Sequence, residues 1–185
     1  MCIRDSANSV HVDLALKHDI DILWIGARST VSPFIVQEIA NALKGTDKIV
    51  LIKNPVNPDL SLWLGGIERI YTSDIKKIGA IHRGFSTYDK SNYRNNPEWQ
   101  IAVELQSNFP DLPLICDPSH IAGNRDLSFD LINNFCGGML DGHHLKAYLQ
   151  GGASGGILPA AINFLAAAAF ISGKSMIPPH GRNMR

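Results

Sequence analysis

Five side chains with catalytic or binding chemistry recur along the chain, each at or just after an apolar run. They are Arg28, Lys53, Arg83, His120 and Asp141. Two arginines and a lysine in one cavity favour a small polyanion, because guanidinium groups bind phosphate or carboxylate bidentately and an ammonium adds a compact charge. Imidazole and carboxylate together suit manganese, iron or zinc. The residue types therefore predict a site for a phosphorylated acid beside a divalent metal.

Neighbouring polar residues have a structural and a functional explanation. Cys116 is expected to be a small core residue rather than a nucleophile, and Cys116 or His143 is a further possible metal donor. Asp117 and Ser119 are explained by a turn around Pro118. The polar loop at 88–97 includes Lys90 and Arg94. For these two side chains, simple exposure to solvent and a functional role are equally good explanations.

The elements that must position these residues are short apolar runs separated by amphipathic stretches. We predict strands at 20–28, 48–55, 77–84, 112–120 and 136–144. Their nearly continuous apolar character indicates a parallel sheet that is covered on both faces. A doubly wound sheet usually carries a glycine-rich phosphate loop, and neither of the common glycine motifs occurs. We therefore predict an incomplete (β/α)8 TIM barrel of about five to six βα units, whose strand ends share one mouth.

Helices are expected between the strands. The stretch 32–45 has Ser32 as N-cap and Pro33 at its first position, and in the stretch 57–74 the helix is expected to start after Asn57 and Pro58. The stretch 96–110 offers Asn96 as a cap and Pro97 at its first position. A further helix is expected upstream, at 10–19.

Composition narrows the class of protein. The 185 residues are 45% hydrophobic, and 17 Lys and Arg balance 17 Asp and Glu. This balance argues against a protein whose overall positive charge attracts nucleic acid or an anionic membrane. Three cysteines without metal-ligand spacing favour a reducing, cytoplasmic setting. The longest apolar stretch, 157–172, contains Pro and Asn and is too short for a membrane span.

Four strand-end motifs carry a family resemblance: "WIGARST", "LIKNPVNPD", "GAIHRGFSTYDKSNYRNNP" and "ICDPSHIAGNR". In this order they resemble 3-deoxy-D-arabino-heptulosonate 7-phosphate (DAHP) synthase, in the short form that some bacteria fuse to chorismate mutase. The resemblance runs from about Ala7 to Asp141. It implies a TIM barrel that condenses phosphoenolpyruvate with erythrose 4-phosphate and water to DAHP and phosphate. This is the first step of the shikimate pathway to the aromatic amino acids.

The resemblance also implies roles for individual residues. Arg28 and Arg83 would hold the phosphate of phosphoenolpyruvate, with Ala27 beside them in the substrate site. Lys53 would hold the carboxylate end of this substrate and serve in proton transfer. His120, in "DPSH", corresponds to a metal-binding histidine, and Asp141 aligns with a metal-binding glutamate of the family. The full-length parent is expected to be a homo-oligomer.

The chain also departs from the family. The first βα units, with their "GPCS" and "KPRT" segments, and the normal C-terminus are not found in it. We expect 1–6 to be a non-native leader, 7–144 a partial barrel domain and 145–185 an atypical tail. Two other functions stay open: 3-deoxy-D-manno-octulosonate 8-phosphate synthase, and a catalytically dead fragment that binds anions. The motifs "GARST" and "HRGFSTYDKSNYRNNP" favour the heptulosonate enzyme.

Overall fold

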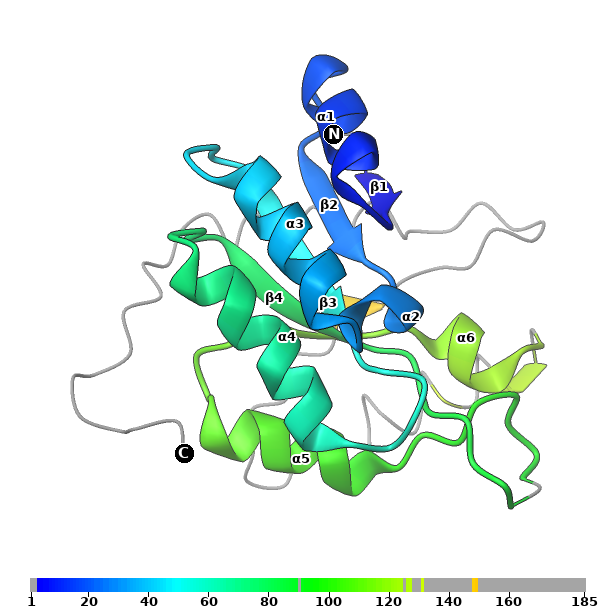
Figure 1. The fold of residues 1–185 in the computed structure, drawn as a ribbon. Coiled ribbons are helices and arrows are strands. Elements are labelled where there is room, and N and C mark those ends of the chain that lie inside the picture. Colours follow the sequence, from blue (N-terminus) through cyan, green and yellow to red (C-terminus); the bar gives the residue numbers. More distant parts are fainter. Residues whose placement is uncertain (1–2, 90, 125, 128–130, 132–147, 150–185) are drawn as a thin grey trace.

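The computed structural model describes residues 3–89, 91–124, 126–127, 131 and 148–149. Strands alternate with helices along most of this part of the chain (Figure 1). In chain order the elements are β1 (Ile3–Ser6), α1 (Ser9–Lys17), β2 (Ile22–Ile25), α2 (Ala27–Thr30), α3 (Pro33–Leu43), β3 (Ile49–Lys53), α4 (Leu60–Thr72), β4 (Ile78–His82), α5 (Trp99–Asn108), β5 (Leu114–Cys116), α6 (Pro118–Ala122) and β6 (Tyr148–Leu149). None of the described helices is both long and apolar enough to cross a membrane.

The strands form one parallel sheet in the order β1-β2-β3-β4-β5-β6. Each strand therefore lies beside its predecessor in the chain, and the order never reverses as it does in a doubly wound sheet. Lys53 is paired in register with Ile81, and His82 with Cys116. The carboxyl ends of β3, β4 and β5 consequently lie side by side, which brings the residues after them to one edge.

Four of the five predicted strands are confirmed as β2, β3, β4 and β5, but the predictions 20–28 and 112–120 run too far, because their last residues belong to the helices α2 and α6. The fifth, at 136–144, lies outside the described residues. Two further strands come from segments that we did not expect in the sheet. Ile3–Ser6, in the expected leader, forms β1 beside β2, and Tyr148–Leu149, in the expected tail, forms β6 beside β5. The origin of both segments stays a prediction.

The helix starts follow local capping chemistry where no tertiary contact competes. Ser32 caps α3 by accepting the backbone N–H of Ile35 at 3.4 Å, and Pro33 is the first helical residue, as predicted. The helix expected after Pro58 begins at Leu60, because Asp59 is its cap and accepts the N–H of Leu62 at 3.0 Å. Side-chain acceptors thus satisfy N–H groups that have no partner inside the helix.

The predicted cap of α5 is wrong. Asn96 does not cap this helix; Glu98 precedes it in a left-handed conformation, with φ of 42°. The backbone of Asn96 instead pairs with Phe85 in an antiparallel bridge, with N–H···O distances of 2.7 and 2.8 Å. This tertiary pairing requires extended backbone, so the helix starts later, at Trp99.

Side chains alternate between the two faces of the sheet. On one face, residues such as Leu23, Val50 and Ile52 belong to the large core cluster that includes the buried side chains of α1, α3, α4 and α5. On the other, the buried side chains of Ile22, Ile49, Leu51, Ile81 and Ile115 form a second, smaller cluster, against which Trp24 packs. Because side chains alternate along a strand, Lys53 shares this second face with Leu51. A buried lysine therefore follows directly on an apolar layer.

Candidate functional site

Lys53, at the end of β3, is a buried cation held by two groups. Its side chain is 9% exposed, and Nζ lies 3.7 Å from Oδ2 of Asp117. The ammonium also lies 4.7 Å from the centroid of the Trp24 ring, over the aromatic face. A carboxylate and an aromatic face both favour a positive charge. The end of β3 therefore presents an oriented ammonium.

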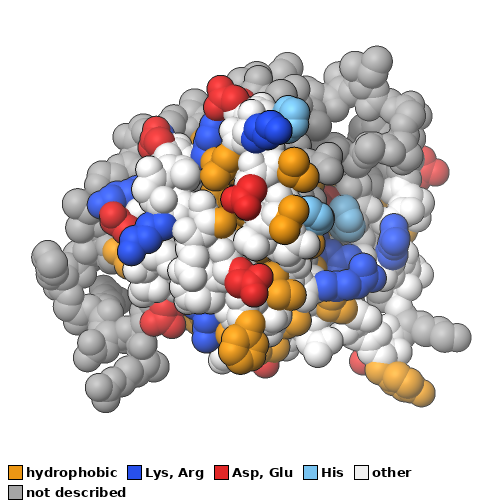
Figure 2. Space-filling model, turned by 45° about the horizontal axis from the view of Figure 1, so that its top comes forward, with side chains coloured by type: hydrophobic (Ala, Val, Ile, Leu, Met, Phe, Trp, Pro, Cys, Tyr) orange, Lys and Arg blue, Asp and Glu red, His pale blue; other side chains and the backbone are white. Residues whose placement is uncertain are grey.

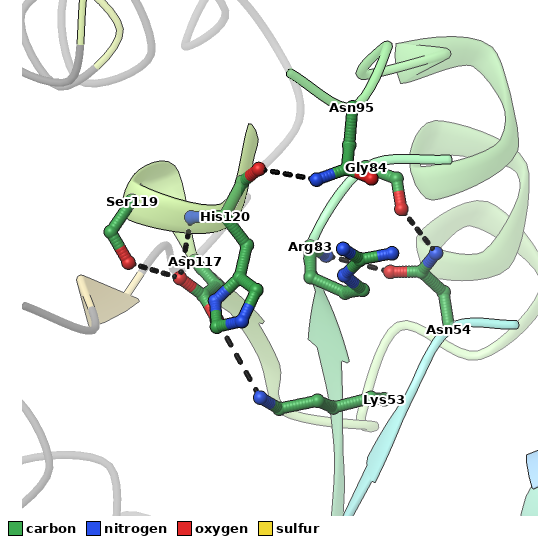
Figure 3. A network of polar contacts seen from close by, with 8 residues as sticks. All are labelled: Lys53, Asn54, Arg83, Gly84, Asn95, Asp117, Ser119 and His120. Atoms are coloured by element: carbon green, nitrogen blue, oxygen red, sulfur yellow. Dashed lines mark hydrogen bonds and ion pairs between the residues drawn. The ribbon is translucent and has the colours of Figure 1, made fainter. Parts of the chain in front are cut away.

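Asp117 directly follows β5 and uses both carboxylate oxygens. Oδ1 caps α6: it accepts the backbone N–H of His120 at 3.2 Å and the hydroxyl of Ser119 at 2.8 Å. Oδ2 lies 2.7 Å from Nδ1 of His120. Instead of a turn, Pro118 begins the helix α6, which Asp117 caps. Asp117 also lies between Lys53 and His120 (Figure 3).

The surroundings of Asp117 keep it ionised. Its burial opposes the charged form, since the side chain is fully buried. The hydrogen bond and charge of His120, the charge of Lys53 and the hydrogen bond from Ser119 together outweigh burial and lower the pKa of Asp117 below its ordinary value. Asp117 is therefore a carboxylate that only accepts hydrogen bonds at neutral pH.

Arg83, directly after β4, has a fixed backbone and a half-buried side chain. Its N–H donates to Oδ1 of the fully buried Asn54 at 2.6 Å. The amide nitrogen of Asn54 donates to the carbonyls of Pro55 and Gly84, at 2.8 and 2.9 Å. Asn54 thus ties the ends of β3 and β4 together, and it sets the direction in which Arg83 leaves the strand (Figure 3).

Asn95 makes the corresponding link between the loop after β4 and α6. Its Nδ2 donates to the carbonyl of His120 at 2.5 Å, and its backbone N–H donates to the carbonyl of Ile121 at 3.1 Å. Gly84, with φ of +76°, permits the close approach of this loop, because a Cβ there would lie 2.7 Å from the carbonyl oxygen of Asn95. The backbones that carry Arg83 and His120 are therefore joined.

Arg28 and Arg94 complete the cationic group. Burial is the main cause that lowers the pKa of Arg83; the charges of Arg94 and Arg28 lower it further, and Asp117 opposes them. Arg28, on α2, and Arg94 are exposed. No hydrogen bond or ion pair joins any of these three guanidinium groups to another residue in the described part of the chain. Figure 2 shows Lys and Arg side chains gathered beside histidines on one part of the surface.

The sequence profile described as the DAHP synthetase I family matches residues 6–147. The chain belongs to this family. It is 32% identical over 111 residues to a phospho-2-dehydro-3-deoxyheptonate aldolase of Thermotoga maritima, a match that covers 60% of the chain and 31% of the relative. The match therefore spans about a third of the length of this curated relative.

Two solved structures also resemble the chain. One is the crystal structure of a Thermotoga maritima phospho-2-dehydro-3-deoxyheptonate aldolase (DAHP synthase), with a TM-score of 0.60, 25% identity and coverage of 70% of this chain and 36% of that one. The other is a truncated DAHP synthase from Thermotoga maritima, with a TM-score of 0.59, 25% identity and coverage of 70% and 46%.

The structure brings most of the predicted DAHP synthase residues to one place. Lys53 ends β3, Arg83 directly follows β4, and His120 lies in α6 after β5. Asp117 contacts both Lys53 and His120, and Asn54 binds the backbone of Arg83. Ala27 begins α2, next to Arg28 in the chain. Asp141, the second predicted metal ligand, and His143 lie outside the described residues, as does Lys90. Cys116 is buried in the large core cluster, as expected.

Sequence reasoning missed Asn54 and Asn95. Each is a buried amide that fixes the backbone of a site residue rather than pointing at a ligand. Their signals in the sequence are an amide directly after a buried strand, in "IKNP", and an amide pair in a loop, in "YRNNP". These signals are weak, because Asn is also common in turns.

Of the two predicted metal ligands, His120 lies in the described part of the chain and Asp141 does not. The described residues hold no group of three or more His, Cys, Asp or Glu side chains that could bind an ion. The imidazole of His120 nevertheless fits a metal ligand, because Asp117 holds Nδ1 and the side chain is 44% exposed. A carboxylate beside the second ring nitrogen is typical of metal-binding histidines.

Proposed function

We propose that this chain carries the phosphoenolpyruvate-binding part of a DAHP synthase. The observation that carries the proposal is the convergence of Lys53, Arg83 and His120 at the ends of consecutive strands, in a chain of the DAHP synthetase I family. The reaction would join phosphoenolpyruvate to erythrose 4-phosphate, with release of phosphate.

Phosphoenolpyruvate suits the charges of the site. Arg28 and Arg83 would bind its phosphate, since their guanidinium groups make no ion pair with the described residues and can bind oxygens bidentately. Lys53 would bind the carboxylate from its fixed position between Trp24 and Asp117. Ala27, beside Arg28, would line the same subsite. Three cations would thus hold both ends of one small polyanion.

The cations would also assist the chemistry. The methylene carbon of phosphoenolpyruvate attacks the aldehyde of the sugar phosphate, and water adds to the neighbouring carbon before phosphate leaves. Fixed cations hold the substrate in a reactive geometry and offset the charge on the departing phosphate. A manganese, iron or zinc ion, held by His120 and Asp141, would polarise the aldehyde.

We further infer that the described sheet is a sector of a TIM barrel. The sequential order of six parallel strands supports this, since every neighbour in a barrel wall is the next strand in the chain. Fusion to chorismate mutase, a homo-oligomeric parent and a cytoplasmic setting remain predictions.

A thermal melt with and without phosphoenolpyruvate and manganese tests the proposal, because a ligand that binds only the folded chain raises its stability. We expect an upward shift with phosphoenolpyruvate that Lys53→Ala and Arg83→Ala reduce. No shift in the unmodified chain would refute the binding site.

Turnover assays then separate the alternatives. DAHP formed from erythrose 4-phosphate supports the proposed reaction, whereas a preference for arabinose 5-phosphate supports the octulosonate enzyme. A melting temperature that phosphoenolpyruvate raises, without any turnover, supports an anion-binding fragment. This alternative matters because the match covers only 31% of the curated relative.

A further inference from the structure

The last two carbonyls of β3 are bound by side chains from two different helices. The indole Nε1 of Trp63, on α4, donates to the carbonyl of Ile52 at 3.2 Å. The hydroxyl of Thr30, on α2, donates to the carbonyl of Lys53 at 2.9 Å. Both donor side chains are buried. The end of β3, which presents the ammonium of Lys53, is thus tied to the short helix α2, which lies beside it and carries Arg28 (Figure 1).

The hydroxyl of Thr30 takes the place of a strand partner. The pairing of β2 with β3 ends at Ile25 and Ile52, so Lys53 lies one residue beyond the last pair. At this level the chain after β2 has already turned into α2, which begins at Ala27. A buried carbonyl without a donor is costly. Thr30 supplies a donor to the buried carbonyl of Lys53 from within α2.

The two branches of the Thr30 side chain have different surroundings, and the side chain is only 3% exposed. Cγ2 packs over Gly66 of α4, where a Cβ would lie 3.0 Å from it. Oγ1 also lies 3.1 Å from the carbonyl of Gly26, a local contact that threonine often makes in helices. A hydroxyl has one proton, so the two carbonyls share it. The shorter contact, to Lys53, is the one that joins α2 to another element.

The helix α2 has little stability of its own. It has four residues, and its N-cap, Gly26, offers no side-chain acceptor. A single helical turn is unstable in isolation, because nucleation costs more than its few hydrogen bonds return. The position of α2, and with it that of the exposed Arg28, therefore depends on tertiary contacts such as the hydrogen bond from Thr30 to Lys53.

We propose that Thr30 is a positioning residue whose hydroxyl holds Arg28 at a fixed distance from Lys53, so that the two cations bind opposite ends of one small polyanion. Arg28 lies two residues before Thr30 in the same helical turn, so any movement of α2 would displace the guanidinium relative to the ammonium. The choice of phosphoenolpyruvate as this polyanion rests on the proposed function. The attachment of α2 to β3 is a property of the ligand-free chain.

Three substitutions separate the hydroxyl of Thr30 from its other properties. Thr30→Val has nearly the same shape and removes the hydroxyl, whereas Thr30→Ser keeps the hydroxyl and removes the methyl group. Thr46→Val is the matched control, because the hydroxyl of Thr46 donates to the carbonyl of Leu43 at 2.7 Å. Thr46 precedes the amino end of β3, whereas the cationic site lies at the carboxyl end.

Amide hydrogen exchange followed by NMR tests the attachment in the ligand-free chain. The N–H groups of Ser29 and Thr30 each donate to the carbonyl of Gly26 at 2.9 Å, and the N–H of Val36 in α3 is the internal reference. Thr30→Val should speed exchange at positions 29 and 30 about tenfold relative to Val36, whereas Thr30→Ser and Thr46→Val should not. An unchanged ratio in Thr30→Val overturns the proposal. Unprotected exchange at Ser29 and Thr30 in the unmodified chain overturns it too, even if Thr30→Val fails to fold.

A double-mutant cycle on phosphoenolpyruvate affinity tests whether Thr30 acts through Arg28. In calorimetry, Thr30→Val should weaken binding about fivefold, because α2 must then be ordered when the ligand binds. Thr30→Ser should restore the affinity, and Thr46→Val should leave it unchanged. In the Arg28→Ala background, Thr30→Val should change the affinity by less than about twofold.

Losses that multiply, or full affinity in Thr30→Val, overturn the positioning role, since a merely structural threonine would not depend on Arg28. Absence of phosphoenolpyruvate binding in the unmodified chain, together with the expected exchange pattern, has a different meaning. It refutes the proposed function, and with it the choice of ligand, while the attachment of α2 by Thr30 stands.

Discussion

Two parts of the cationic site are built differently. Lys53, Asp117 and His120, which we call the fixed group, are joined by contacts of 2.7 and 3.7 Å around a fully buried carboxylate. Arg28 and Arg94, the exposed arginines, have solvent-exposed side chains without hydrogen bonds to the rest of the described chain. The fixed group is ordered when the chain folds, whereas the exposed arginines would lose side-chain freedom only on binding a ligand.

The difference follows from the elements that carry each residue. Lys53 and Asp117 lie at the ends of central strands, where the sheet and its connections bury them. Arg28 lies on the short helix α2 and Arg94 in a loop. Arg83 combines both properties, with a backbone fixed by Asn54 and a half-buried guanidinium. Changes near the fixed group should therefore alter folding stability, and changes to the exposed arginines should alter binding.

The largest effect is expected at Gly84, which lets the loop with Asn95 approach the fixed group. A Cβ at Gly84 would lie 2.7 Å from the carbonyl oxygen of Asn95, and φ is +76°. Gly84→Ala should lower the free energy of unfolding by about 4 kcal/mol in urea titrations, through backbone strain and steric overlap. Gly45→Ala is the control: φ is +80°, but nothing lies within 4 Å. It should cost only about 1 kcal/mol. Equal losses would contradict the close approach.

A smaller loss is expected at Asn54. Asn54→Ala leaves the N–H of Arg83 and the carbonyls of Pro55 and Gly84 without their partner, and should reduce the free energy of unfolding by about 3 kcal/mol. Gln37→Ala removes an exposed amide contact with Asn41 of 3.1 Å and should change it by less than about 0.5 kcal/mol. Equal losses of unfolding free energy for the two variants in urea titrations would show that the buried hydrogen bonds of Asn54 do not stabilise the fold.

His82, whose carbonyl anchors Asp117, makes stability depend on pH. Its ring lies among Trp63, Phe85 and Trp99, with centroid distances of 6.4, 5.7 and 5.1 Å. Burial lowers the pKa of His82 to about 3, with a contribution from the charge of Arg83; the Pro97 carbonyl and Asp117 oppose this shift without supplying a hydrogen bond of good geometry.

Between its ordinary pKa and this lowered one, the unfolded chain binds a proton at His82 that the folded chain does not. Stability should therefore fall as the pH falls, by about 2 kcal/mol from pH 7 to pH 5 for this residue. Unfolding titrations at the two pH values measure the loss, and His82→Phe should remove this part of it. The same pH dependence in both chains would refute a neutral, buried His82.

The smallest change in stability is expected for the exposed arginines. Arg28→Ala should alter the free energy of unfolding by less than about 0.5 kcal/mol. It should nevertheless weaken phosphoenolpyruvate binding about tenfold in calorimetry, because a charge-assisted hydrogen bond is lost. Destabilisation above 1 kcal/mol, or unchanged affinity, would break the contrast between the two groups.

Local patterns in the sequence were sufficient for much of the framework. Continuous apolar runs predicted β2 to β5, and the Ser32-Pro33 pair predicted the start of α3, since burial and capping depend on nearby residues. The same patterns placed Lys53, Arg83 and His120 at strand ends, where a parallel sheet gathers them. The strand-end motifs indicated the family that the profile match then showed.

Contacts between distant segments decided the rest. The backbone of Asn96 pairs with Phe85 instead of capping α5. Ile3–Ser6 forms a strand because it pairs with the edge of β2. The shared oxygen of Asp117 and the bridges made by Asn54 and Asn95 join residues that lie far apart in the chain. Sequence determined which side chains lie at the carboxyl ends of the strands, because strand period and burial are local properties. Only the tertiary structure decided how they bind one another, since hydrogen-bond geometry depends on how the strand ends and loops pack.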